Sequence, residues 1–430
     1  MTRTRPAVAL AAVLLASACA SATPTASSTT HLTLWSHGGT AAEQRVVGDQ
    51  VRAFEAAHPG TTVTVRVITE GDYDDAVQTA IAGDGLPDVV DVDGPLVASY
   101  AYQGALQPLD ALVPAAKARM LPSLRAQGTW RGKLWAVGAF DSGLGLWADR
   151  SALRRAGVRV PTGPTDAWTA REMTAALAAL ARHDADGKVL DLRRDYGDGE
   201  WLTYGFAPLL SSAGGGLVGQ NGRASGVLDS PRSVHALETL AGWRRYVDDD
   251  EDGQAFTSRR APLSWVGHWT YADYRKALGP DLVLLPLPDL GNGSKSGQGT
   301  WAWAIGSTST RAKAAAGLVD WLTSTASATS MTSANGAVPG TEAALQQSPL
   351  VGPTGPLHLY ASQLSRTCGT GPVTRACTAV SRPVTPGYPT ITAAFAGAVA
   401  SVLRGGDPAT ALTAAAQRID RDVTANRGYR

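Results

Sequence analysis

The 430-residue sequence has few charged residues, only three cysteines and no long apolar run. Charged residues make up 17%, against about 25% in typical proteins, and 38 basic against 37 acidic residues give a net charge of +1. Because binding to a polyanion needs a concentrated basic surface, this balance excludes a nucleic-acid partner. No apolar run reaches the roughly 20 residues of a membrane-spanning helix. Apolar residues still reach 44%, enough for roughly two to three domains of about 150 residues.

The first 18 residues have the features of an export signal. Arg3 and Arg5 form a short cationic region, and residues 7–18 form an apolar region that is too short to span a bilayer. Small residues then precede Cys19. We therefore expect residues 1–18 to be a signal peptide that directs the chain out of the cytoplasm.

Cys19 stands where bacterial lipoproteins carry their lipidated cysteine, although Ala16 occupies the position that is usually leucine. Residues 19–30 are then a lipidated cysteine followed by a flexible tether of Ser, Thr, Ala and Pro. This predicts anchoring to the outer face of the cytoplasmic membrane through lipid alone. The alternative is cleavage without lipidation, which leaves Cys19 as a free thiol.

The other two cysteines, Cys368 and Cys377, are predicted to form a disulfide, because the exterior is oxidising and lipidation of Cys19 leaves an even number. The alternative is two free thiols. A disulfide here would close a short loop that contains Gly369, Gly371 and Pro372.

Residues 32–92 alternate short apolar runs with amphipathic helices. Thr40 and Glu43 match a capping box, which opens a helix with Val47, Val51 and Phe54 on one stripe. This βαβαβ order predicts a parallel sheet, whose ligands lie beyond the carboxyl ends of the strands. Strands are predicted at 32–35, 63–67 and 87–92, a second helix at 74–82, and loops at the ligand edge at 36–39, 70–73 and 91–94.

The rest of the chain predicts a second α/β lobe. Helices are expected at 171–182, 233–247, 311–323, 391–403 and 408–423, and strands at 144–147, 282–287 and 301–305. Joints rich in glycine and proline, at 138–145, 291–300 and 336–340, are expected to carry the chain between the lobes.

The motifs of common enzyme classes are missing from the sequence. There is no Gly-x-Ser-x-Gly, His-Glu-x-x-His, Ser-x-x-Lys or Walker A motif. Gly214, Gly216 and Gly219 have the dinucleotide-binding spacing, but Gln-Asn-Gly follows where a helix would have to begin. The histidines and cysteines form no metal-ligand cluster of usual spacing. We expect no cofactor and no metal; carboxylates that are distant in sequence leave glycoside hydrolysis open.

Aromatic and acidic residues gather at the predicted sheet edges. A sugar has C–H-rich faces and a rim of hydroxyl groups, so its receptor needs flat rings and polar side chains. Trp269 and Trp301 are the favoured rings, because each lies near glycine in a predicted interlobe segment. Alternatively, Trp35 belongs to the core, and Asp72 and Tyr73 to an ordinary surface loop. The candidate rings are Trp35, Tyr73, Trp201, Trp269, Trp301 and Tyr388, and the candidate polar residues are His37, Asp72, Asp93 and Asp141.

Seven segments also occur in a recognisable order. They are Leu-Thr-Leu-Trp at 32–35, Val-Arg-Ala-Phe-Glu-Ala-Ala-His-Pro-Gly at 51–60, Gly-Leu-Pro-Asp-Val-Val at 85–90, Gly-Ala-Leu-Gln-Pro-Leu-Asp at 104–110, Phe-Asp-Ser-Gly-Leu at 140–144, Pro-Leu-Ser-Trp-Val-Gly-His-Trp at 262–269 and Asn-Gly-Ala-Val-Pro-Gly at 335–340. In this order and spacing the chain resembles the extracellular solute-binding proteins of ABC importers, in the carbohydrate-binding group that includes the maltodextrin-binding protein.

The resemblance implies an α/β, two-lobed periplasmic-binding-protein-like fold of type II, with hinge crossings and a ligand cleft between the lobes. The N-terminal lobe would comprise 31–138 plus 306–336, and the C-terminal lobe 142–303 plus 340–430. The resemblance also implies that Asp141 is a polar ligand contact, that Trp269 stacks on sugar and that Trp301 lines the cleft. Thr300 departs from the Gly-Gly-Trp sequence common at that place in the family.

The expected function is that of a substrate-binding lipoprotein, which captures a sugar or oligosaccharide outside the cytoplasm and delivers it to a membrane permease. Such a protein is a monomer and not an enzyme. Two alternatives remain open: a receptor for another solute, such as a glycerophosphodiester or a polyamine, and an exported carbohydrate-active enzyme.

Overall fold

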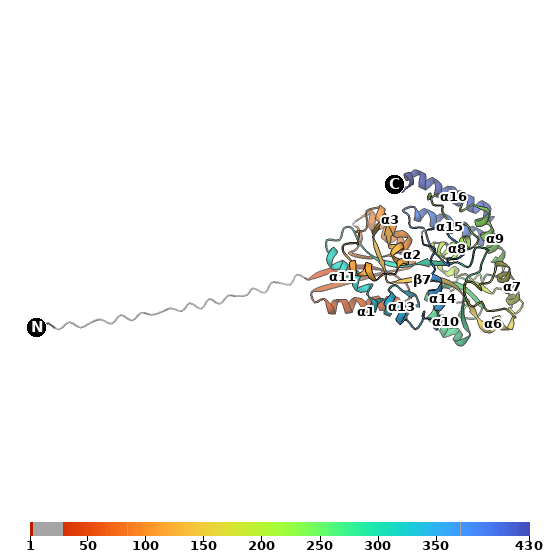
Figure 1. Cartoon of the computed structure of the whole chain (residues 1–430), viewed down its shortest axis with the longest axis horizontal. Coiled ribbons are helices and arrows are strands. Elements are labelled where there is room, and N and C mark those ends of the chain that lie inside the picture. Colours follow the sequence, from red (N-terminus) through yellow and green to blue (C-terminus); the bar gives the residue numbers. More distant parts are fainter. Residues whose placement is uncertain (3–28, 84, 370) are drawn as a thin grey trace.

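The computed structural model describes residues 1–2, 29–83, 85–369 and 371–430. Residues 3–18 of the predicted signal peptide, Cys19 and residues 20–28 of the tether lie outside these residues. The described chain forms two α/β lobes, each built around its own sheet (Figure 1). The predicted α/β, two-lobed fold is confirmed.

The first sheet has the strand order β2-β1-β3-β12-β6. β1 is parallel to both β2 and β3, whereas β12 is antiparallel to β3 and β6. β12 joins this sheet from much later in the chain than its neighbours. It spans residues 301–305, so the lobe boundary predicted at residue 303 falls inside this strand. The strands are β1 (Thr30–His37), β2 (Thr61–Ile68), β3 (Val89–Asp93), β12 (Trp301–Ile305) and β6 (Ala136–Gly138).

The predicted capping box opens the first helix. The Thr40 hydroxyl accepts from the Glu43 amide, and the Glu43 carboxylate accepts from the Thr40 amide. The buried stripe of this helix, α1, includes Val47, Val51 and Phe54, and α1 packs against α11 and α12. The helices around the first sheet are α1 (Ala41–Ala57), α2 (Glu70–Ala82), α3 (Val97–Tyr102), α4 (Pro114–Arg119), α5 (Pro122–Gly128), α11 (Ala312–Leu322) and α12 (Thr325–Asn335).

The loop predicted at 70–73 is wrong, because these residues form the first turn of α2. There the Asp72 carboxylate accepts a hydrogen bond from the Thr69 hydroxyl, and negative charge is favourable at a helix N-terminus. Tyr73 therefore projects from a helix rather than from a loop.

The second sheet is centred on one long, fully buried strand, β7. The strand order is β14-β11-β7-β9-β8, and β10 and β13 also pair with β7. A separate hairpin joins β4 (Thr129–Trp130) to β5 (Lys133–Leu134). The strands of the second sheet are β7 (Phe140–Asp149), β8 (Leu190–Asp191), β9 (Leu263–Gly267), β10 (Leu282–Leu285), β11 (Ser296–Gly299), β13 (Val338–Pro339) and β14 (Ala379–Ser381).

The chain passes from β6 of the first sheet to β7 of the second inside the crossing predicted at 138–145, and the glycines of β7 make room for packing. A Cβ atom at Gly143 would lie 2.8 Å from the Tyr360 ring, and one at Gly145 would lie 2.6 Å from Leu284. The chain changes lobes in the short step from β6 to β7, and again between β11 and β12 and between α12 and β13.

Helices cover the second sheet, and α15 packs against both α16 and α8 at its upper edge in Figure 1. These helices are α6 (Arg150–Arg155), α7 (Ala170–Ala181), α8 (Glu200–Ser212), α9 (Pro231–Trp243), α10 (Tyr271–Leu278), α14 (His358–Leu364), α15 (Tyr388–Leu403) and α16 (Pro408–Ala425), with α13 (Glu342–Gln347) beside the crossing. Short 3₁₀ turns are η1 (Gly94–Leu96), η2 (Arg194–Tyr196), η3 (Arg244–Tyr246), η4 (His268–Thr270), η5 (Gly279–Asp281) and η6 (Arg427–Tyr429).

Candidate functional site between the lobes

One wall of the site is formed by rings at the edge of the first sheet. His37 ends β1 and Trp301 begins β12, and their rings stack with centroids 3.9 Å apart. The ring of Tyr73, from α2, meets Trp301 edge-on at 5.4 Å. Tyr73 is buried, and its hydroxyl donates to the carbonyl oxygen of Asp91 at 2.6 Å. The predicted residues His37, Tyr73 and Trp301 therefore form one group.

The buried carboxylate of Asp91 holds the His37 ring in place. Its Nδ1 lies 2.5 Å from Oδ2 of Asp91, and burial raises the pKa of Asp91 although His37 opposes the shift. A cavity of about 20 Å³ lies behind His37 and Trp301. It has room for one water molecule and not for a sugar.

The second wall belongs to the second lobe and centres on Trp269. Its indole lies over Gly267, where a Cβ atom would be 2.0 Å from the ring. Tyr204 stacks beside it at 6.3 Å, and Trp201 meets it edge-on at 6.2 Å. The indole N–H donates to the Tyr196 hydroxyl at 2.9 Å. Trp269 keeps part of its surface open, whereas Trp201 is buried.

Arg382 joins the two walls. Its guanidinium donates to both carboxylate oxygens of Asp93, at 2.6 and 2.7 Å, and to Glu200 at 2.6 Å. It also lies over the Tyr204 ring, 4.6 Å from the centroid. Burial opposes its charge, but Asp93 and Glu200 hold the pKa of Arg382 above its ordinary value. Asp93 was predicted as a polar site residue; here it is an ion-pair partner across the lobes.

Glu200 is held by two further groups. The hydroxyl of Tyr388 donates to Oε1, and the hydroxyl of Thr392 donates to Oε2 at 2.6 Å. Burial raises the pKa of Glu200, against the lowering effect of Arg382. The Tyr388 ring is fully buried, so Tyr388 meets the site through its hydroxyl alone.

Asp74, on α2, adds another carboxylate to this region. Its side chain is open to solvent by surface area, yet it lies in the field of Asp93, Glu200 and Arg382. Desolvation by neighbouring protein groups, followed by repulsion from Asp93 and Glu200, raises the pKa of Asp74 to about 7. Like charges that lie close together disfavour ionisation even where a carboxylate keeps some exposure.

Asp141 lies at the start of β7, beside the crossing. It is buried and accepts hydrogen bonds from Gln298 at 2.7 Å and Gln127 at 3.4 Å. Burial raises the pKa of Asp141 to about 6 despite these donors. Its side chain is therefore enclosed by protein groups.

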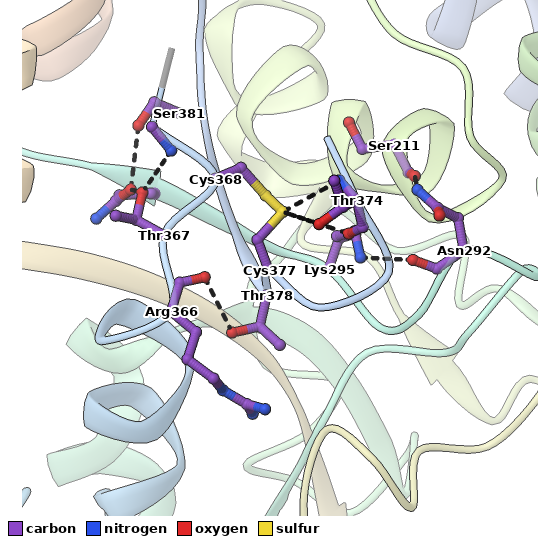
Figure 2. Close-up of a disulfide and its surroundings, with 12 residues drawn as sticks. Ser211, Asn292, Lys295, Arg366, Thr367, Cys368, Thr374, Cys377, Thr378 and Ser381 are labelled. Carbon is purple, nitrogen blue, oxygen red and sulfur yellow. Dashed lines mark hydrogen bonds between the residues drawn. A yellow bond between two sulfur atoms is a disulfide. The ribbon is translucent and has the colours of Figure 1, made fainter. Parts of the chain in front are cut away.

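The predicted disulfide between Cys368 and Cys377 is confirmed (Figure 2). It lies on the loop that leads into β14. Thr367 and Ser381, at the two ends of this loop, donate their hydroxyls to Oε1 of Gln298 at 2.6 and 3.1 Å. The residues that flank the disulfide loop thus position Gln298, whose side-chain amide donates to Asp141.

Two predicted residues lie elsewhere. Trp35 packs beneath the guanidinium of Arg66, 4.7 Å from the ring centroid. Asp72 is exposed at the start of α2 and bonds to Thr69. Whether the ten predicted residues contact a ligand stays a prediction.

Sequence reasoning missed Tyr204, Glu200 and Arg382. Glu200 and Tyr204 are four residues apart, which places them on one face of a helix, so a search for acidic-aromatic pairs at this spacing would have found them. Arg382 meets Asp93 across 289 residues, and no local pattern marks it.

Among the described residues, no group of three or more His, Cys, Asp or Glu is placed to hold a metal ion. Within the same part of the chain, none of the helices has both the length and the apolar character needed to cross a membrane.

Known proteins share this architecture. The GacH receptor of Streptomyces glaucescens, solved unliganded and with acarbose, is 23% identical, with a TM-score of 0.77 and coverage of 94% of this chain and 100% of that one. An ABC substrate-binding protein of Listeria monocytogenes, in complex with cycloalternan, is 19% identical, with a TM-score of 0.78 and coverage of 92% and 99%. At these identities the likeness establishes the fold.

Sequence comparisons give the family. An uncharacterised lipoprotein of Streptomyces antibioticus is 31% identical over 181 residues, which are 39% of this chain and only 37% of that relative. The model of the bacterial extracellular solute-binding proteins matches residues 35–329. That match covers more than half of the chain and includes both walls of the site except the part around Arg382 and Tyr388. The chain therefore belongs to the family of bacterial extracellular solute-binding proteins.

Proposed function

We propose that this protein binds a sugar or oligosaccharide between its lobes and delivers it, chemically unaltered, to the permease of an ABC importer. The observation that carries the proposal is a chain of contacts between two partly open indoles, Trp301 on the first lobe and Trp269 on the second. Trp301 begins β12 opposite Asp93 of β3, Asp93 pairs with Arg382, and Arg382 lies over the Tyr204 ring that stacks beside Trp269. Between these walls lie the ionic groups of Asp93, Arg382 and Glu200. Flat rings suit the C–H faces of a sugar, and charged hydrogen-bonding groups suit its hydroxyl rim.

The ligands of the similar structures support the same class of solute. Acarbose and cycloalternan, in the complexes of the two similar proteins, are carbohydrates. We assign the stacking contacts to Trp269 and Trp301, and the hydroxyl contacts to Asp93, Glu200 and Arg382. Tyr204 adds a buried hydroxyl for which no hydrogen-bond partner is found among the described residues, so it has a donor to offer a ligand.

We further propose that the chain is exported, lipidated on Cys19 and monomeric, and that it is not an enzyme. The lipoprotein relative supports the anchor. Incorporation of a labelled fatty acid by the expressing cells tests it: label in the wild-type protein and none in Cys19→Ser is expected. Equal labelling of the two would overturn the anchor and leave the sugar proposal intact.

The ligand class is tested by a melting-temperature screen of the purified protein with maltodextrins, disaccharides, glycerophosphocholine and spermidine. We expect stabilisation by at least one carbohydrate, because a ligand that binds only the folded state raises its stability. Stabilisation by spermidine or glycerophosphocholine alone would replace the proposal with one of the other solute classes. Chromatography of the recovered sugar separates receptor from enzyme, since a receptor returns it intact.

A further inference from the structure

We propose that Tyr196 holds the Trp269 indole in its orientation and donates its own hydroxyl proton to a hydroxyl oxygen of the bound sugar. The inference rests on the proposed function, because it places a sugar against Trp269, and it adds a residue that decides which sugars fit there. Tyr196 ends the η2 turn, just before the α8 helix that carries Glu200 and Tyr204. Tyr196 and Trp269 both belong to the second lobe, so their pairing is independent of the position of the first lobe.

The hydrogen bond between Trp269 and Tyr196 has only one possible direction. An indole N–H can donate and cannot accept, so the hydroxyl oxygen of Tyr196 accepts from Trp269, at 2.9 Å. The O–H proton of Tyr196 therefore points away from the indole and is left to donate to another group. Tyr196 is 37% exposed and Trp269 is partly open, so a molecule stacked on the indole can reach this hydroxyl.

The Tyr196 ring is held by neighbouring side chains. The guanidinium of Arg193 lies over the ring, 4.3 Å from its centroid, and donates to both carboxylate oxygens of Asp195, at 2.8 and 2.6 Å. The Trp201 indole meets the Tyr196 ring edge-on at 5.3 Å, and its own N–H donates to the carbonyl oxygen of Leu192 at 2.9 Å. The Tyr196 hydroxyl is thus carried by a ring with contacts on its face and at its edge.

The backbone of Arg193 also supports a functional role for this turn. Its φ of 53° lies in the left-handed region, which residues other than glycine rarely adopt. The Asp191 carboxylate stabilises this conformation by accepting from the Arg193 amide at 2.7 Å, and it also accepts from the Ser264 hydroxyl at 2.8 Å. Such conformations persist where surrounding contacts hold them, and they concentrate at binding sites. Here the strained residue is the one whose side chain supports Tyr196.

The pairing determines how the second wall distinguishes sugars. Because Tyr196 takes the indole N–H, Trp269 offers a sugar its flat face, and the polar contact at that edge comes from the Tyr196 O–H. A sugar with a hydroxyl there satisfies this donor, whereas a sugar with hydrogen in its place leaves the donor unpaired and is disfavoured. Tyr196 is thus a specificity-determining residue beside a stacking residue.

Nuclear magnetic resonance and calorimetry of the exported chain test the two roles of Tyr196. Tyr196→Phe removes the oxygen and keeps the ring. In protein with isotope-labelled tryptophan, we expect this variant to shift the indole N–H signal of Trp269, which Trp269→Phe identifies. Calorimetry uses the maltodextrin or disaccharide that stabilises the protein most in the melting-temperature screen. Its affinity for Tyr196→Phe should fall by about three- to tenfold, the effect of one hydrogen bond.

The matched control is Tyr246→Phe, in the η3 turn of the same lobe. The Tyr246 ring also lies under an arginine, Arg245, at 4.6 Å, and its hydroxyl accepts from that guanidinium at 2.6 Å. Tyr246→Phe should change neither the Trp269 signal nor the affinity. Circular dichroism confirms that each variant is folded before it is compared.

Monodeoxy analogues of the same sugar locate the contact. One analogue should bind wild type more weakly than the parent sugar, by a factor similar to the loss in Tyr196→Phe. The variant should bind that analogue as tightly as it binds the parent sugar, because each change removes one partner of the same hydrogen bond.

The proposal would be overturned by an unchanged affinity in Tyr196→Phe, by the lack of any analogue coupled to this variant, or by an indole signal that stays in place. If wild type and Tyr196→Phe bind the sugar equally, the role of Tyr196 fails and the proposed function stands. If wild type binds no carbohydrate, the proposed function fails and donation to a sugar fails with it, whereas the indole signal still tests the pairing with Trp269.

Discussion

The imidazole of His37 lies parallel to the indole of Trp301, with 6° between the ring planes. One face of Trp301 is therefore covered by the first lobe itself, and Tyr73 holds the indole from the edge. A bound sugar can stack only on the part of Trp301 that the lobe leaves open. Contacts with His37 and Tyr73 hold the indole within the first lobe, and a side chain that is already held in place loses less entropy when a ligand binds.

Replacing either wall indole should weaken sugar binding. We expect Trp301→Ala and Trp269→Ala each to reduce affinity at least about tenfold, since a buried aromatic anchor contributes roughly 2 kcal/mol or more. Isothermal calorimetry with the sugar found in the screen measures the effect. Trp130→Ala, in the β4–β5 hairpin, serves as the control and should bind normally. Unchanged affinity in both wall variants would remove these rings from the site.

The closed state should weaken as the pH rises through about 7. Asp74 has a raised pKa of about 7 beside Asp93, Glu200, Arg382 and Asp75, and separation of the lobes restores its ordinary, lower pKa. The closed state then binds the Asp74 proton more tightly than the open state, so loss of that proton favours opening.

Scattering of the empty protein at about pH 6 and pH 8 measures this response, with a larger radius of gyration expected at the higher pH. Asp74→Asn should reduce the change; the part that remains would come from Glu200, whose pKa is also raised. A wild-type radius that stays constant, or an undiminished response in the variant, would contradict the role of Asp74.

The buried carboxylate of Asp141 should make folding less favourable as the pH rises. Its folded pKa of about 6 lies above the ordinary value of 3.8, so the folded state holds the proton more tightly between these values. Relative to Asp141→Asn, the wild-type free energy of unfolding should fall by up to about 3 kcal/mol between pH 4 and pH 7. Urea denaturation at both pH values measures it. Parallel pH profiles for the two proteins would show that Asp141 is not buried in this way.

Loss of the Cys368–Cys377 disulfide should destabilise the second lobe. The cysteines are nine positions apart, and closing so short a loop contributes about 2 to 3 kcal/mol through the entropy of the unfolded chain. Denaturation of Cys368→Ser/Cys377→Ser should show this loss, and reductant should lower the stability of wild type but not of the variant. If reductant leaves wild type unchanged, the disulfide contributes nothing.

Local patterns predicted the elements that depend on neighbouring residues. The Thr40–Glu43 capping box, the stripe of α1 and the order β1-α1-β2-α2-β3 all follow from spacings of a few residues. The parity of the cysteines was enough to predict the disulfide. These features can be predicted from sequence because they depend on interactions between residues that are close together in the chain.

Contacts between distant segments were harder to predict. Gly143 and Gly145 were predicted as part of a crossing between the lobes, whereas they lie within β7, where Tyr360 and Leu284 require their small size. Tyr388 looked like a candidate ring, but its ring is buried and only its hydroxyl reaches Glu200. Such roles depend on tertiary packing, which a single sequence does not display.

The most direct test is native mass spectrometry of the exported protein after incubation with a mixture of oligosaccharides. The account predicts a complex of one protein with one intact sugar, and release of that same sugar when the complex is dissociated. Retention of no carbohydrate, or recovery of shortened products, would contradict it.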